Sequence, residues 1–167
     1  VGSGGMESLY KDGKEWLYRS PRPAFWRAAT DNDRGNGFVF RSAVWSAADR
    51  FVRCVKVTAR MDEQEISMPP APENNKYNGD ETCDRFEISY TYETPTVPVT
   101  EVTVSYLVES DGRIHVQVDY LGKQGLPELP VLGLRFLMPT AAEGYTYEGL
   151  SGETYPDRMA GGIPGVY

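Results

Sequence analysis

The sequence predicts an all-β fold, an antiparallel β-sandwich, and three features of its 167 residues support that prediction. Several segments alternate apolar and polar residues at a period of two, which is typical of half-buried strands. Turn residues separate these segments at short intervals, and only one stretch shows helical spacing. Several short strands with almost no helix favour two packed antiparallel sheets. The length allows one ordinary hydrophobic core, so we expect a single domain over residues 1–167.

The N-terminal part is predicted to hold a short hairpin and a short helical segment. Asp12 and Gly13 supply a turn between residues 6–10 and 15–18. Further along, residues 40–51 show helical spacing, and we expect one or two helical turns there. The apolar face of that segment consists of Val44, Trp45, Ala47, Ala48 and Phe51.

Three stretches rich in β-branched and aromatic residues are predicted strands, namely residues 51–59, 86–92 and 131–138. The last is largely apolar and is bounded by proline at both ends, so we expect it to be more fully buried than the others. Residues 67–79 contain three prolines and two adjacent asparagines without any period, which predicts a loop.

The clearest prediction is a hairpin formed by residues 100–108 and 113–120. The Asp111–Gly112 pair between them readily adopts the positive φ angles of a tight turn. Alternation gives each segment one apolar face. The two faces consist of Val102, Val104, Tyr106 and Val108 on the first segment and Ile114, Val116, Val118 and Tyr120 on the second.

The composition excludes some classes of partner. The net charge is −7 and the sequence contains no basic stripe, which argues against nucleic acid. No apolar run approaches the ~20 residues that span a membrane, so we expect a soluble protein. The first five residues lack the features of a signal peptide, and both ends resemble cuts within a longer polypeptide, which predicts a partial domain. Cys54 and Cys83 fit one disulfide or two thiols, which leaves the bacterial cytoplasm and periplasm both open.

Asp31 and Asp33 are the obvious pair to test as catalytic carboxylates, because two carboxyl groups roughly 5 Å apart can act as nucleophile and acid/base. They lie among turn-forming residues, and Arg27 and Arg34 are close enough in sequence to pair with them. We therefore interpret the segment as a buried structural turn. A calcium loop is disfavoured, since glycine and serine stand where such a loop needs an oxygen ligand and a glutamate.

The histidine and the three tryptophans are further candidates for a functional site. His115 is the only histidine and lies on the polar face of a predicted strand, so solvation is the simplest interpretation and a metal site is not expected. Trp16, Trp26 and Trp45 fit either a platform that stacks on sugar rings or the core of a sandwich. The core is favoured, and Trp45 has the better case for partial exposure.

Four segments form an ordered set of motifs. Residues 25–35 read Phe-Trp-Arg-Ala-Ala-Thr-Asp-Asn-Asp-Arg-Gly, and residues 44–48 follow as Val-Trp-Ser-Ala-Ala. Residues 129–134 read Leu-Pro-Val-Leu-Gly-Leu, and residues 153–158 read Glu-Thr-Tyr-Pro-Asp-Arg. In order and spacing they resemble the C-terminal small-chain domain of the β-galactosidases of glycoside hydrolase family 2. The matching structural-motif residues are Phe25, Trp26, Arg27, Thr30, Asp31, Asn32, Asp33, Gly35, Glu153, Tyr155, Asp157 and Arg158.

The resemblance implies a supersandwich of the galactose-mutarotase-like class, of which this chain holds the N-terminal part. In that family the catalytic glutamates belong to a TIM barrel that hydrolyses terminal β-galactosides, and no residue here matches them. This domain would support the barrel and shape the mouth of its active site, with Trp45 and Asp49 nearest the galactoside. Asp49 stands where the family has glycine.

Further expectations follow from the same resemblance. We expect no catalytic activity and no cofactor in this chain, since the Mg and Na ions that the family often uses would belong to the barrel. A sandwich cut partway leaves open sheet edges, so we also expect self-association. Two alternatives stay open: a carbohydrate-binding module that uses aromatic and Asp/Asn side chains, and an aldose-epimerase-like enzyme. The latter needs histidine and carboxylate groups in one cleft, which makes it the weakest candidate.

Overall fold

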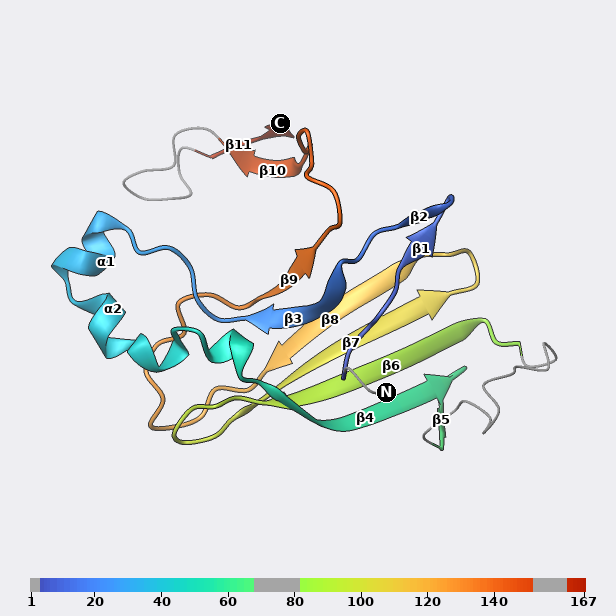
Figure 1. Cartoon of the computed structure of the whole chain (residues 1–167), viewed down its shortest axis with the longest axis horizontal. Helices are drawn as coiled ribbons and strands as arrows, with labels where there is room; N and C mark the ends of the chain where they lie inside the picture. Colours follow the sequence, from blue (N-terminus) through green and yellow to red (C-terminus); the bar gives the residue numbers. More distant parts are fainter. Residues whose placement is uncertain (1–3, 68–81, 152–161) are drawn as a thin grey trace. The chain divides into compact units, whose positions relative to one another are not determined.

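The computed structural model describes residues 4–67, 82–151 and 162–167 (Figure 1). Its fold is all-β and sandwich-like, as predicted, and the chain divides into two compact units, Val1–Leu137 and Met138–Tyr167. The strands are β1 (Tyr10–Lys11), β2 (Lys14–Glu15), β3 (Arg19–Ala24), β4 (Arg53–Met61), β5 (Gln64–Ile66), β6 (Arg85–Glu93), β7 (Glu101–Glu109), β8 (Ile114–Tyr120), β9 (Gly133–Leu137), β10 (Glu148–Ser151) and β11 (Ile163–Val166). The helices are α1 (Asp31–Gly35), α2 (Phe38–Arg41) and the single 3-10 turns η1 (Ala43–Trp45) and η2 (Ala48–Arg50).

The first unit is built on a five-stranded antiparallel sheet with the strand order β5-β4-β6-β7-β8. The register pairs Val104 with Val118 across β7 and β8, so the two predicted apolar faces of the hairpin coincide. Tyr90 of β6 lies opposite Val104 and extends that face. The other face is polar, and the hydroxyls of Ser89 and Ser105 lie 2.7 Å apart across β6 and β7. One face of the sheet can therefore pack against a hydrophobic core, and the other face suits contact with solvent.

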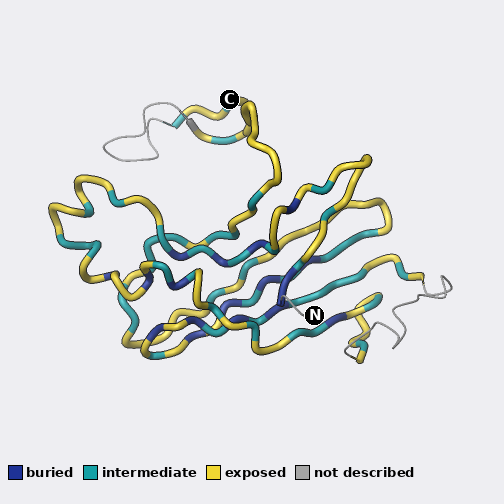
Figure 2. The backbone as a smooth tube through the Cα atoms, viewed as in Figure 1, coloured by how far each residue is buried: buried dark blue, intermediate teal, exposed yellow. Residues whose placement is uncertain are grey.

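A two-stranded antiparallel ribbon, β3–β9, supplies the second layer of the first unit. Leu134 of β9 packs against the apolar face of the five-stranded sheet, on a cluster of Tyr90, Tyr92, Val104 and Tyr106. A second cluster joins the segment after β3 to the 3-10 turns and the sheet, and it consists of Phe25, Trp45, Ala48 and Val102. The buried positions in Figure 2 accordingly follow the central strands and β3.

The structure confirms most predicted elements and corrects two. The early hairpin exists as β1–β2, and residues 40–51 do form short helical turns. Residues 131–138, expected to be more fully buried than the other strands, instead give β9, whose side chains are half-buried or exposed because β3 is its only partner in the described chain. Residues 31–35, expected to form a buried turn, instead give the one-turn helix α1, which buries no residue.

The second unit contains the antiparallel pair β10–β11, in which the rings of Tyr147 and Tyr167 stack with centroids 5.4 Å apart. Two predictions fall outside the described residues: nearly all of the loop at 67–79, and the motif at 153–158. In the part of the chain that is described, no helix has the length and apolar character needed to cross a membrane.

Candidate functional site

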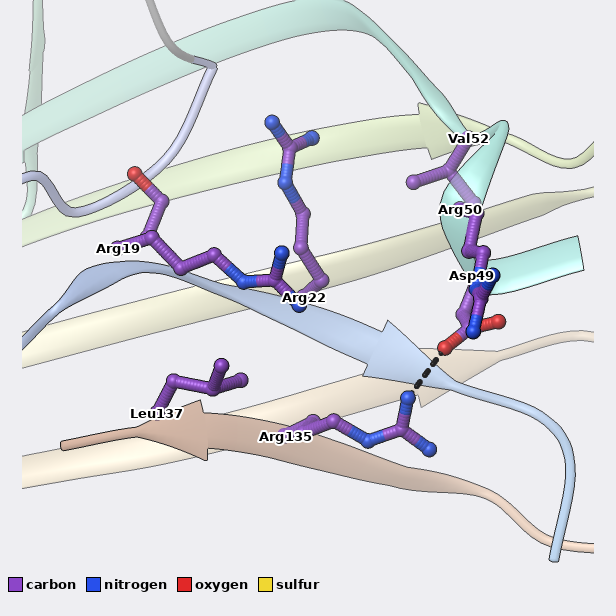
Figure 3. Close-up of a pocket in the computed structure, with 8 residues that line it drawn as sticks. Arg19, Arg22, Asp49, Arg50, Val52, Arg135 and Leu137 are labelled. Atoms are coloured by element: carbon purple, nitrogen blue, oxygen red, sulfur yellow. Dashed lines mark hydrogen bonds and ion pairs between the residues drawn. The ribbon is translucent and has the colours of Figure 1, made fainter. Parts of the chain in front are cut away.

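The first unit has a hollow of about 640 Å³ beside the β3–β9 ribbon (Figure 3). Four arginines line it: Arg19 and Arg22 from β3, Arg50 from η2 and Arg135 from β9. The remaining lining residues are Ser20, Asp49, Val52 and Leu137. We call this feature the arginine hollow.

The ribbon fixes two walls of the arginine hollow. Arg22 lies opposite Arg135 in the register of β3 and β9, and Arg19 lies opposite Leu137. β3 carries Pro21 and Pro23, both buried, on either side of Arg22. Proline cannot donate to a ladder, which suits β3 to an edge position where its other side stays unpaired. The prolines thus anchor the strand and leave Arg22 at the hollow.

Asp49 is the one acidic side chain among the described residues that line the hollow. Its carboxylate accepts a hydrogen bond from Nη1 of Arg135 at 2.6 Å, and its side chain is 11% exposed (Figure 3). The guanidinium of Arg22 lies 5.8 Å from the ring centroid of Tyr92, a cation–π contact. Asp49 and Tyr92 therefore hold two of the four guanidinium groups in place, and the lining keeps an excess of positive charge.

This arrangement is suited to binding rather than to bond breaking. A guanidinium group donates in a fixed planar fork that matches carboxylates and phosphates. A general base needs an unengaged acceptor near the reacting proton, and the carboxylate of Asp49 is occupied by Arg135. The hollow therefore offers a site for an oxyanion.

The predicted carboxylates, Asp31 and Asp33, lie in α1. Thr30 caps this helix and forms a capping box with Asp33: the Thr30 hydroxyl accepts from the Asp33 amide at 3.2 Å, and the Asp33 carboxylate accepts from the Thr30 amide at 2.8 Å. The predicted partners are confirmed, since Arg27 pairs with Asp33 at 2.5 Å and Arg34 with Asp31 at 2.9 Å. A Thr-x-x-Asp capping box is why a helix, not a turn, starts here.

The environment of Asp33 does not fit a catalytic acid. The hydrogen bond from Arg27 holds the pKa of the Asp33 carboxyl well below its usual range, and the hydrogen bonds from Thr30 act in the same direction. A glycosidase acid needs a raised pKa, so that it still carries its proton near neutral pH. Asp31 has a fully exposed side chain. The two aspartates act at the start of α1 as cap and ion-pair partners.

The two residues expected nearest a substrate have different surroundings. The Trp45 side chain is fully buried, and its indole Nε1 donates to the carbonyl of Pro127 at 3.2 Å. Its ring packs 5.5 Å from that of Phe25, so no ring face is presented to a sugar. Asp49, in contrast, lines the arginine hollow. Trp26 is partly buried against the cluster around Phe25, which agrees with a place in the core.

The structure also gives the surroundings of the remaining candidates from the sequence. His115 is exposed, and its Nε2 lies 3.1 Å from a carboxylate oxygen of Glu109. Cys54 and Cys83 are both free thiols. Asn32 and Gly35 are exposed residues of α1. Glu153, Tyr155, Asp157 and Arg158 lie outside the described residues.

Sequence reasoning missed the arginine hollow. Its arginines stand at positions 19, 22, 50 and 135, so the sequence shows no local cluster or basic stripe that would predict the site. They come together only through the pairing of β3 with β9 and the return of η2 against the ribbon. The one local signal was Arg19-Ser20-Pro21-Arg22-Pro23, in which proline disfavours a central strand and predicts an edge.

Comparison with known proteins gives consistent matches. The family model described as "Beta galactosidase small chain" matches residues 2–167. The chain is 59% identical over 165 residues to the "Beta-galactosidase small subunit" of Latilactobacillus sakei, covering 99% of this chain and 52% of that protein. It is 36% identical over 165 residues to the "Beta-galactosidase" of Clostridium acetobutylicum, covering 98% of this chain and 16% of that protein. It is 32% identical over 161 residues to that of Lactobacillus delbrueckii subsp. bulgaricus, covering 96% of this chain and 14% of that protein. The chain thus spans about half the length of the first relative and a smaller share of the others.

Proposed function

Because the chain belongs to the β-galactosidase small chain family, we propose that it is the non-catalytic β-sandwich part of a glycoside hydrolase family 2 β-galactosidase. It works with a large subunit that carries a TIM barrel and both catalytic carboxylates. Its role is to support that barrel and to shape the mouth of the active site. The enzyme hydrolyses terminal β-galactosides, which meet this chain only indirectly.

The observation that carries the proposal is the 59% identity to a protein named a small subunit. The same stretch matches 14–16% of proteins named simply β-galactosidase. A module found in both settings suits a division of labour in which other parts of the enzyme perform the chemistry. The motif residues from Phe25 to Gly35, which resemble the signature of family 2, support the same assignment.

The side chains of this chain support a non-catalytic role. Asp33 is held ionised by Arg27 and by the Thr30 amide, and Asp49 is engaged by Arg135. Neither group suits the acid that must protonate a leaving glycoside oxygen. Under this proposal, the Mg and Na ions that the parent family often uses would belong to the barrel domain.

The runner-up is a carbohydrate-binding module. Exposed aromatic side chains do occur on the β1–β2 hairpin and beside it, at Tyr10, Trp16 and Tyr18. The Lys14 ammonium, however, sits 4.4 Å from the centroid of the Trp16 ring, so one face of the best sugar platform is covered. With Trp45 also buried, stacking on sugars has little support.

Two measurements on the purified chain test the proposal. Hydrolysis of nitrophenyl β-galactoside should be absent, and calorimetric titration with galactose, lactose and longer galactosides should give no binding heat. Binding of a galactoside without turnover would favour the carbohydrate-binding module. Turnover that survives removal of host enzyme, and that disappears in Asp31→Asn or Asp33→Asn, would overturn the non-catalytic role.

A further inference from the structure

We propose that the arginine hollow binds a small oxyanion, a phosphate or carboxylate group, between Arg19 of β3 and Arg50 of η2. The oxyanion is either a free inorganic ion or the anionic group of a small organic molecule. This site goes beyond the proposed function, since no step of galactoside hydrolysis involves it. Its failure would therefore leave the proposed function untouched.

The inference rests on Arg19 and Arg50 alone. Both residues are exposed and line the hollow, and among the described residues neither side chain makes an ion pair or a hydrogen bond. Arg22 and Arg135 have interactions within the chain and are not counted as available donors. Because Arg19 and Arg50 line one hollow from two different elements, an anion in that hollow can accept hydrogen bonds from both (Figure 3).

The Asp49 carboxylate shows which chemistry the hollow accepts. It receives a hydrogen bond from Nη1 of Arg135 at 2.6 Å, and its side chain is 11% exposed. A guanidinium group presents parallel N–H donors that match the oxygens of a carboxylate or phosphate, and such charge-assisted hydrogen bonds are strong. One oxyanion of the chain itself therefore occupies part of the lining. Arg19 and Arg50 offer the same donors to a second oxyanion from solution.

The size of the hollow suits a small molecule. Its volume of about 640 Å³ lies within the range of small-molecule sites, roughly 300–1,000 Å³. Val52 and Leu137 add apolar surface to the lining, and an organic group attached to the anion can contact them. A neutral galactoside would form no ion pair with either arginine, so the charge of the lining favours an anionic ligand.

The test is calorimetric titration of the full-length protein with sodium phosphate and, separately, with phenyl phosphate at constant ionic strength. We expect both probes to bind saturably. The principal variant is Arg19→Gln with Arg50→Gln, and the matched control is Arg60→Gln, at an exposed arginine of β4 outside the hollow. The double variant should raise the Kd of both probes at least about tenfold, because it removes charge-assisted hydrogen bonds. Arg60→Gln should keep Kd within about twofold of the parent value.

The comparison of the two probes identifies the source of the oxyanion. A lower Kd for phenyl phosphate indicates that the apolar lining contacts an organic group, whereas equal values indicate the free ion. Arg19→Lys with Arg50→Lys keeps both charges but loses the planar forks, so its Kd should lie between those of the parent and the double Gln variant. Thermal melts supply a second readout, since phosphate should raise the melting temperature of the parent and of Arg60→Gln but not of the double Gln variant.

Two results would overturn the site. Absence of saturable binding of either probe by the parent would show that the hollow is merely solvated or is covered by polypeptide outside this chain. Equal binding by the parent and the double Gln variant would show that the anion binds elsewhere. If the double Gln variant does not fold, Arg19→Gln and Arg50→Gln are measured singly, and unchanged binding in both also overturns the site. The proposed function is judged separately, by nitrophenyl β-galactoside hydrolysis.

Discussion

At the scale of single residues, the start of α1 depends on one carboxylate. Asp33 accepts hydrogen bonds from Nη1 and Nη2 of Arg27 at 2.5 and 3.1 Å and from the Thr30 amide at 2.8 Å. The Asp33 side chain is 13% exposed while that of Arg27 is 40% exposed, so the pair lies at the surface rather than in the core. The Asp33–Arg27 pair therefore stabilises the start of α1 locally, and the pH dependence of stability can reveal that effect.

Asp33→Asn should make the thermal stability of the chain less dependent on pH in the acidic range. The pKa of Asp33 is lowered in the folded chain, mainly by Arg27, so its stabilising effect is complete above the ordinary carboxyl pKa of about 4. That effect is lost as pH falls toward the lowered pKa. Thermal melts should show Asp33→Asn about 2–4 °C below the parent at pH 7, and the difference should shrink below pH 4. The control, Asp31→Asn, should melt within about 1 °C of the parent throughout, and a pH-independent difference for Asp33→Asn would contradict the account.

Two buried tyrosines offer a matched pair of substitutions. The Tyr92 hydroxyl donates to the carbonyl of Gly4 at 2.6 Å, whereas the Tyr106 hydroxyl is buried without a hydrogen-bond partner among the described residues. Burial raises the pKa of Tyr106 to about 12, which agrees with an apolar setting. Tyr92→Phe should lower the free energy of unfolding, measured in urea, by about 1–2 kcal/mol, because it leaves the buried Gly4 carbonyl without its hydrogen-bond donor. Tyr106→Phe should be neutral or stabilising, and the reverse order would show that the buried contacts are misassigned.

At the scale of elements, β8 is the longer of the two edge strands of the five-stranded sheet in the described chain, with 7 residues against 3 in β5. Ile114 and Val116 lie on the apolar face there and are 37% and 44% exposed. An unpaired edge strand with exposed apolar side chains is a template for association. β8 is therefore the element through which we expect this chain to self-associate when it is alone.

Val116→Lys should reduce that self-association. A charge on the apolar side of an edge strand opposes edge-to-edge pairing. Light scattering at high concentration should show an average mass near that of the monomer for Val116→Lys and above it for the parent. Gln117→Lys, one residue along on the opposite face, should behave like the parent. A parent chain that stays monomeric at every concentration would contradict this expectation.

The elements that sequence predicted are those encoded by neighbouring residues. The β7–β8 hairpin followed from alternation and from the Asp111–Gly112 turn, because both signals are local. The pairing of β3 with β9 joins residues more than 100 positions apart, and no periodicity specifies such a partner. For that reason the position and exposure of β9 were predicted less well. The arginine hollow, built on this pairing, was not foreseen at all.

At the scale of the whole molecule, the proposed function makes the sandwich a module that leaves chemistry to another chain. Among the described residues, its five-stranded sheet and β3–β9 ribbon enclose an apolar core, and its candidate site is a charged hollow beside the ribbon, not a cleft with an acid–base pair. Predicting this role from sequence required motifs rather than composition. The motif at Phe25–Gly35 was the main sequence signal for the proposed role. In the structure this segment contains the cap of α1, its ion pairs and the buried Phe25, so its residues act in the fold.

The most direct test of this division of labour is a titration of the large subunit with the small subunit, followed by nitrophenyl β-galactoside hydrolysis. The small subunit alone should show no turnover at any concentration. Turnover by a fixed amount of large subunit should rise as the small subunit is added and should level off at a stoichiometric ratio. Full activity of the large subunit alone, unchanged by the small subunit, would contradict the central claim, as would turnover that follows the small subunit by itself.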